Sequence, residues 1–140
     1  MDCTVSWLGN GGMAFSAETG SGHLLNMDGA PEAGGKNLAP RPMELLLAGA
    51  GGCSAFDVVL ILQKARQAVS GCDVELKAER ANEDPKVFTK IDLHFIVTGK
   101  DLDQTKVERA VKLSHDKYCS ATAMLAKTAE LTYSIEVRSE

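Results

Sequence analysis

Alternation of apolar and polar residues predicts β-structure in several parts of the chain. Near the N-terminus, three short segments separated by glycine-rich turns predict a meander of antiparallel strands, over residues 3–8, 13–18 and 23–27. Two longer alternating segments, 72–80 and 87–98, flank the turn ANEDPK. This pair is typical of a hairpin with one buried face.

One segment is apolar without alternation. Between Leu45 and Leu62, apolar residues occupy nearly every angle around a helix, which is typical of a helix surrounded by protein. Pro42 suits the first turn of this helix, and Glu44 lies favourably near the positive end of its dipole. The sequence therefore predicts a long core helix from Pro42 to about Ala68. The preceding residues, 29–41, contain prolines and glycines without periodicity and predict a long loop.

Shorter helices and a last strand follow the hairpin. Asp101 or Asp103 can cap a helix whose apolar positions keep helical spacing. These positions are Val107, Ala110, Val111 and Ser114. A short third helix is predicted to begin near Cys119, and renewed alternation over 131–137 predicts a final strand.

The predicted order is three strands, a long helix, two strands, one or two helices and a final strand. This order indicates an α+β fold in a single domain over residues 1–140. One sheet can cover only one side of the long helix, so its other apolar sides need further cover. The same helix of a second subunit is the expected cover, which predicts a homodimer.

Composition narrows the class of protein. Apolar residues make up 44% and charged residues 24%, which is typical of a soluble globular protein. The net charge is −4 and the basic residues are scattered, so we expect no nucleic-acid partner. Residues 43–62 have the length of a membrane span, but Glu44, Asp57 and several glycines interrupt them, so we expect no membrane partner. The N-terminus lacks the pattern of a signal peptide, and a cytoplasmic location is expected.

The four cysteines, Cys3, Cys53, Cys72 and Cys119, are far apart in the sequence. Without a C-x-x-C pair they indicate neither a zinc motif nor a secreted disulfide framework. In a reducing compartment, a cysteine pair that matters is more often redox-active than structural.

Cys53 has an acidic neighbour. Asp57 follows it by one helical turn, which places the thiol and the carboxylate on the same side of the helix. A thiolate needs a nearby cation or a helix N-terminus, and Cys53 lies too deep in its helix for the dipole to help. Arg41, just before the helix, is the first candidate for this cation, and Lys36 in the loop is the second.

Cys119 lies at the predicted start of the third helix, where free N–H groups favour a thiolate. His115, four residues earlier, can act as a base or a proton relay if the preceding helix extends that far. Both observations have plainer interpretations. A cysteine in an apolar helix is most often a small core residue, and a histidine on an amphipathic helix is usually solvated. Residue types and spacing alone therefore leave the function open.

The segment RPMELLLAGAGGCSAFD, the later YCSAT and the order of elements resemble the OsmC/Ohr family of osmotically inducible and organic hydroperoxide resistance proteins. The resemblance covers essentially the whole chain. It implies an intertwined homodimer in which antiparallel sheets wrap around two long central helices.

The resemblance also implies an activity. Cys53 would be the peroxidatic thiolate that reduces an organic hydroperoxide, and Cys119 would resolve the sulfenic acid to a disulfide that a dithiol reductant reopens. A small hydrophobic peroxide is the expected substrate, with no cofactor or metal. In the family, a glutamate follows the proline at the helix start and pairs with an arginine. Here Met43 takes that position, Glu44 is displaced by one residue, and the first 40 residues contain no arginine.

Two other functions stand beside the peroxidase. One is a non-catalytic dimer that binds a small hydrophobic ligand in an interface cleft. The other is a metal site formed by Cys53, Cys119 and His115, which the absence of a compact ligand motif disfavours.

Overall fold

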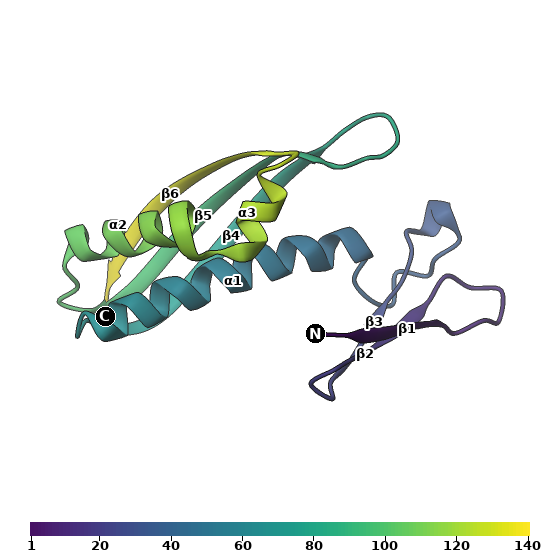
Figure 1. The fold of residues 1–140 in the computed structure, drawn as a ribbon, viewed down its shortest axis with the longest axis horizontal. Coiled ribbons are helices and arrows are strands. Elements are labelled where there is room, and N and C mark those ends of the chain that lie inside the picture. The colour runs from purple at the N-terminus through teal and green to yellow at the C-terminus, as the bar shows by residue number, and fades with distance from the viewer. The chain divides into compact units, whose positions relative to one another are not determined.

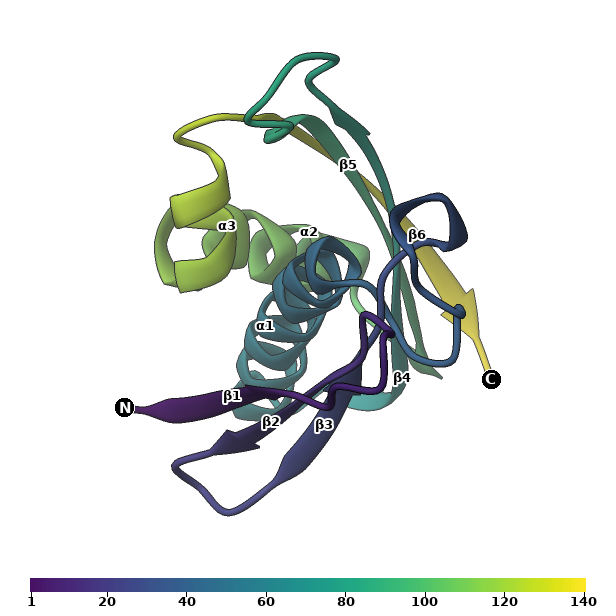
Figure 2. The same ribbon diagram turned by 90° about the vertical axis from the view of Figure 1, so that its right-hand side faces the viewer.

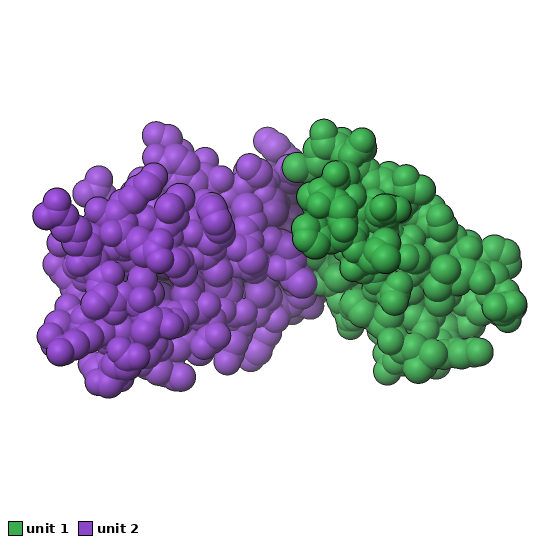
Figure 3. All heavy atoms as spheres, turned by 90° about the horizontal axis from the view of Figure 1, so that it is seen from below, with its two compact units in different colours: residues 1–46 green, residues 47–140 purple.

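The computed structural model describes all residues from Met1 to Glu140. The chain forms two compact units, residues 1–46 and residues 47–140, which Figure 3 shows in different colours.

The first unit is built on a three-stranded antiparallel sheet in the order β1-β2-β3. Its strands are β1 (Cys3–Trp7), β2 (Phe15–Thr19) and β3 (Leu24–Met27), which confirms the predicted meander. Only Ala17 and Asp28 of this unit are buried within the chain. Large apolar side chains such as Val5, Trp7 and Leu24 are exposed on the sheet. So few buried residues give this unit very little core of its own.

Asp28 organises the loop that follows the sheet. Its carboxylate accepts hydrogen bonds from the backbone N–H groups of Leu38, Gly29 and Lys36. These hydrogen bonds, led by that from Leu38, lower the pKa of Asp28. The loop contains only one short 3₁₀ turn, η1 (Pro31–Ala33), in agreement with the prediction of a loop over 29–41.

The long helix α1 (Pro42–Lys64) begins where the sequence predicts. The backbone N–H of Arg41 donates to Glu44 Oε2 at 2.9 Å. This is one half of a capping box, so the side chain of Glu44 satisfies a backbone group at the helix start.

The helix ends at Lys64, and the prediction that it extends to about Ala68 is wrong. Arg66 adopts a positive φ of 57°, which stops the helix. Two backbone hydrogen bonds close this end, from Arg66 N–H to Gln63 O and from Gln67 N–H to Leu62 O. This pattern is a Schellman motif with arginine in the position that glycine usually takes.

The second unit contains a sheet in the order β4-β5-β6. Its strands are β4 (Ala68–Arg80), β5 (Phe88–Lys100) and β6 (Glu130–Ser139). The predicted hairpin is confirmed as the antiparallel pair β4 and β5, whereas β6 runs parallel to β5. Between β5 and β6 lie α2 (Gln104–Leu113), the π-type turn η2 (Ser114–Tyr118) and α3 (Ser120–Leu125). The helical segments of this unit lie on one face of the sheet (Figures 1 and 2).

The core of the second unit lies between that face and the helices. Alternate residues of β5 point into it, which confirms the buried face of the hairpin, and α1 and α2 each contribute one stripe. Its members are Val58, Leu62, Ile91, Leu93, Phe95, Val97, Val107, Ala110 and Val111. Each of these side chains is at most 2% exposed.

The opposite face of α1 is not covered within the second unit. Phe56 is 68% exposed and Leu60 is 36% exposed. The helix is long and apolar enough to cross a membrane, and only 28% of its most apolar 18-residue window is buried. Within the second unit, the prediction of a helix surrounded by protein therefore holds for one stripe only. The other apolar side chains are available to a partner.

Truncating the core stripe of α1 is expected to destabilise the protein. Leu62→Ala removes a side chain that is 0% exposed and should lower the free energy of unfolding by about 2–5 kcal/mol. Met124→Ala, at a side chain that is 74% exposed, is the matched control and should change it by less than about 0.5 kcal/mol. Urea unfolding followed by circular dichroism measures both. Equal midpoints for the two variants would contradict this core.

Candidate functional site

Cys53, Asp57 and Cys119 come together in the second unit. The Sγ atoms of the two cysteines and a carboxylate oxygen of Asp57 all lie within 4.8 Å of one another. Cys53 and Asp57 are one turn apart on α1, as their spacing predicts. Cys119 immediately precedes α3. The structure thus places the two sequence-predicted cysteines beside the carboxylate.

The π-type turn η2 sets the position of Cys119. The backbone N–H of Cys119 donates to Ser114 O at 2.9 Å, a hydrogen bond that spans five residues. Cys119 then acts as the N-cap of α3, where its Sγ accepts a hydrogen bond from the backbone N–H of Thr122 at 3.4 Å. Ser54, next to Cys53 on α1, donates its hydroxyl to the same sulfur at 3.3 Å.

Ser114 holds the other side of the site. Its hydroxyl lies 3.1 Å from Asp57 Oδ2 and 3.3 Å from the backbone carbonyl of Ser54, and it donates toward both. Ser54, Ser114 and Thr122 are all buried. A hydrogen-bond network thus connects α1 to η2 and to α3 around the sulfur and carboxylate atoms.

The sequence alone does not predict the roles of these hydroxyl groups. Ser114 was predicted on the apolar side of the second helix, where its polar side chain was itself a signal, because a buried hydroxyl needs a partner. Thr122 follows Cys119 by three residues, the spacing at which an N-cap side chain meets a backbone N–H.

The two thiols differ in their surroundings. Burial raises the pKa of the Cys53 thiol, and the neighbouring Cys119 and Asp57 raise it further. A hydrogen bond from the Ala121 backbone lowers this pKa and offsets part of the rise. Burial also opposes ionisation of Cys119. Hydrogen bonds from Ser54, from Thr122 and from Cys53 together outweigh that burial and lower the pKa of Cys119. Of the two sulfurs, Cys119 is therefore the better place for a negative charge.

His115 does not belong to this site. Its ring packs against Tyr133 with centroids 4.9 Å apart and the rings tilted by 55°, and it is not among the groups that converge with the cysteines. The metal site formed by Cys53, Cys119 and His115 is therefore wrong. The widened turn of η2 brings Ser114, in place of His115, toward α1.

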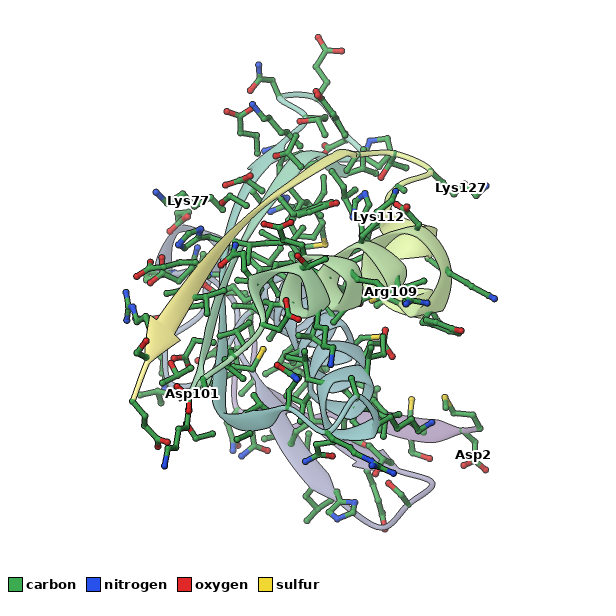
Figure 4. The ribbon with its side chains drawn as sticks, turned by 90° about the vertical axis from the view of Figure 1, so that its left-hand side faces the viewer. Asp2, Lys77, Asp101, Arg109, Lys112 and Lys127 are labelled. Atoms are coloured by element: carbon green, nitrogen blue, oxygen red, sulfur yellow. The ribbon has the colours of Figure 1, made fainter.

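The strongest influences on the two sulfurs are not cations. Burial, hydrogen bonds and neighbouring acidic groups are the largest causes of the pKa shifts of Cys53 and Cys119, and no lysine or arginine is among these largest causes. Figure 4 shows that Lys77, Arg109 and Lys127 project outward, and all three are exposed. The two cations that the sequence suggested, Arg41 and Lys36, belong to the first unit.

A cavity of about 330 Å³ adjoins the site. Asp57 lines it at the end near the cysteines, and Lys64 also lines it. The remaining lining residues are Leu60, Ile61, Leu113 and Tyr118. This cavity is largely apolar and can take a small hydrophobic molecule.

Comparison with known proteins extends this description. The family described as "OsmC-like protein" matches residues 34–134. Protein YhfA of Escherichia coli is 53% identical over 137 residues, which are 98% of each chain. The crystal structure of a hypothetical protein from Aquifex aeolicus is 31% identical, with a TM-score of 0.85, over 99% of this chain and 96% of that one. An organic hydroperoxide resistance protein OsmC from Legionella pneumophila shares the fold at 17% identity, with a TM-score of 0.68 over 97% of each chain.

Removing the hydroxyl of Ser54 is expected to make Cys119 harder to ionise. Ser54→Ala deletes a donor to the sulfur and should raise its pKa, which lowers the thiolate fraction at a given pH by about two- to tenfold. Thiolate absorbance at 240 nm, titrated against pH and referenced to Cys119→Ser, measures the change. Ser120→Ala, at an exposed neighbour, should leave the titration unchanged. A titration of Ser54→Ala that coincides with the wild type would contradict this role of Ser54.

Proposed function

Because the chain belongs to the OsmC-like family, we propose that it is a thiol-dependent peroxidase that reduces organic hydroperoxides in oxidative-stress defence. One observation carries this proposal. Two cysteines 66 positions apart in the sequence have their sulfurs within 4.8 Å of each other. The sulfurs are therefore close neighbours in the fold and need to approach to about 2.05 Å to form a disulfide. The hydroperoxide resistance protein of Legionella pneumophila, which shares the fold, gives further support.

Exposure assigns the two roles in the proposed reaction. Cys119 is 2% exposed, whereas Cys53 is partly exposed and is the sulfur that a peroxide can reach. Because Cys119 is the better place for a negative charge, a proton must pass from the Cys53 thiol to the Cys119 thiolate before Cys53 can act as the nucleophile. The Cys53 thiolate attacks the distal peroxide oxygen and breaks the O–O bond. Cys53 becomes a sulfenic acid, and the alkoxide takes the proton from the Cys119 thiol and leaves as an alcohol, so that Cys119 is again a thiolate.

Cys119 completes the proposed cycle. Its thiolate attacks the Cys53 sulfur, a disulfide forms, and hydroxide leaves and is protonated to water. A dithiol reductant then returns both cysteines to thiols and is itself oxidised to a disulfide. In this proposal Asp57 orients the incoming peroxide or takes up a proton, and Glu44 fixes the helix start at Arg41. Arg41 lies twelve residues before Cys53, about 18 Å along the helix, so it cannot reach this sulfur within one chain.

The apolar cavity favours an alternative function. Leu60, Ile61 and Leu113 line a volume that fits a small hydrophobic ligand, as a non-catalytic binding protein would require. In that alternative the cysteines are incidental to binding. Turnover of a hydroperoxide separates the two functions, because only the peroxidase consumes its ligand.

Loss of either site cysteine is expected to abolish peroxidase turnover. Cys53→Ser removes the nucleophile and Cys119→Ser removes the resolving thiol, so both should reduce the rate with cumene hydroperoxide and dihydrolipoamide to the uncatalysed level. The matched control is Cys72→Ser, which should keep at least half of the wild-type rate. Equal rates for wild type and Cys53→Ser would contradict the catalytic role of Cys53.

The proposal includes a homodimer formed through α1. Six residues of this helix, Gly52, Ala55, Phe56, Val59, Leu60 and Gln63, line a groove of about 330 Å³ on its uncovered face. A Cβ atom added at Gly49 or Gly52 would meet nothing within 4 Å. A second copy of the helix can therefore approach this face closely.

Charging this face is expected to separate the subunits. Wild-type protein should run in size-exclusion chromatography with light scattering at twice the mass of one chain. Phe56→Asp puts a carboxylate into the proposed interface and should give a monomer at the same concentration. Met124→Asp makes the same kind of change at another exposed apolar residue and should remain dimeric. A monomeric wild type would contradict the dimer.

A further inference from the structure

Three acidic donor atoms converge in the site without a counter-ion. The sulfurs of Cys53 and Cys119 and an oxygen of Asp57 lie within 4.8 Å of one another. The ion pairs of the protein lie elsewhere, between Lys112 and Asp116 and around Glu136. Because like charges at this distance repel, the three donors cannot all be ionised unless a cation joins them.

Hydrogen bonds from two buried serines also hold the donor atoms in place. Ser54 donates to the Cys119 sulfur and Ser114 donates to Asp57 Oδ2, and these two serines are 2% and 0% exposed. Metal-binding groups are commonly oriented by such an outer layer of hydrogen bonds. Here the outer layer comes from buried hydroxyl groups on two different elements, so the donor set is preorganised.

The chemistry of the donors selects the class of metal. Two thiolates and one carboxylate suit Zn²⁺, a borderline-soft ion, and do not suit Mg²⁺ or Ca²⁺, which prefer oxygen ligands. Zinc–sulfur bonds of about 2.3 Å place two sulfurs about 3.8 Å apart. Because the donors already lie within 4.8 Å of one another, they need to draw together by at most about 1 Å. Cys53, which is only partly buried, has room to make this adjustment.

We propose that the reduced protein binds one Zn²⁺ per chain through Cys53, Cys119 and Asp57, and that the ion blocks peroxidase turnover. A fourth ligand, a water molecule, would face the cavity that Asp57 lines. Binding displaces the thiol protons, and the bound sulfurs can neither attack a peroxide nor form a disulfide until the metal leaves. This inference rests on the proposed function because both use the same cysteine pair. A requirement for the Asp57 carboxylate distinguishes the zinc site from a redox pair of thiols alone.

Competition with a chromophoric chelator tests this site on the reduced, full-length protein under anaerobic conditions. Zn²⁺ alone is the probe, and one ion per chain is expected. Cys53→Ser and Cys119→Ser should each weaken binding at least 100-fold. Asp57→Asn keeps the size of the side chain and should weaken binding about tenfold or more, and Ser114→Ala should weaken it about 10- to 100-fold. Cys72→Ser is the control and should bind as the wild type does.

A spectroscopic readout identifies the ligands independently of affinity. Co²⁺ in place of Zn²⁺ should give the visible bands of a tetrahedral site and a near-ultraviolet band from sulfur, with the sulfur band reduced in each site cysteine variant. Circular dichroism establishes that each variant is folded.

Three outcomes would overturn the zinc site: no bound ion, equal Zn²⁺ affinity in wild type and Cys119→Ser, or no loss in Asp57→Asn. Turnover of cumene hydroperoxide, assayed with excess chelator and then with saturating Zn²⁺, separates this inference from the proposed function. Turnover with chelator but no zinc binding would leave the peroxidase and overturn the zinc site. Zinc binding without turnover would overturn the peroxidase and support the site, and undiminished turnover with bound zinc would overturn the block.

Discussion

The hydrogen bond from Ser54 to the sulfur of Cys119 joins two parts of the chain that are 65 residues apart. Ser54 lies on the core stripe of α1, and Cys119 lies in the turn between η2 and α3. Both groups are buried, and a buried hydroxyl without a partner costs about 1–3 kcal/mol, so the packing of these elements is tied to this contact. Cys53 and Asp57 flank the same stripe. The contact that satisfies Ser54 therefore also brings Cys53 and Asp57 to Cys119.

The glycines of α1 lie in two different environments. At Gly51 an added Cβ atom would lie 2.7 Å from Leu76 Cδ1, so this glycine lets α1 approach β4 closely. Gly49 and Gly52 have open space around them within the chain. Each costs the helix about 1 kcal/mol relative to alanine, and nothing inside the chain offsets that cost. A closely packed partner helix on that face would explain why both Gly49 and Gly52 are glycines.

Much of the fold could be predicted because its elements depend on local sequence patterns. Alternation predicted the strands, apolar density predicted α1, and Asp103 proved to be the N-cap of α2. The relation of Cys53 to Asp57 followed from helical spacing alone. The end of α1 could not be predicted, because it depends on Arg66 taking a positive φ without glycine. The parallel direction of β6 depends on how the helices cross back over the sheet, which no local pattern reports.

The chemistry of the site was predicted in part for the same reason. Family resemblance indicated the two cysteines, but the hydroxyl groups that hold them come from Ser54, Ser114 and Thr122, whose roles arise only when separate elements meet. The wrong interpretation of His115 came from assuming regular α-helical spacing through residues 114–118, where the chain forms a π-type turn. The result is a site rich in acidic groups, whose reactivity depends on what balances their charge.

Disulfide mapping tests the central claim, that Cys53 and Cys119 act as one redox pair, most directly. Reduced protein is treated with one equivalent of cumene hydroperoxide, remaining thiols are alkylated, and peptides are analysed by mass spectrometry. The account predicts a Cys53–Cys119 cross-linked peptide that disappears after treatment with a dithiol, with Cys3 and Cys72 alkylated. Recovery of both Cys53 and Cys119 as alkylated thiols, while the peroxide is consumed, would contradict it.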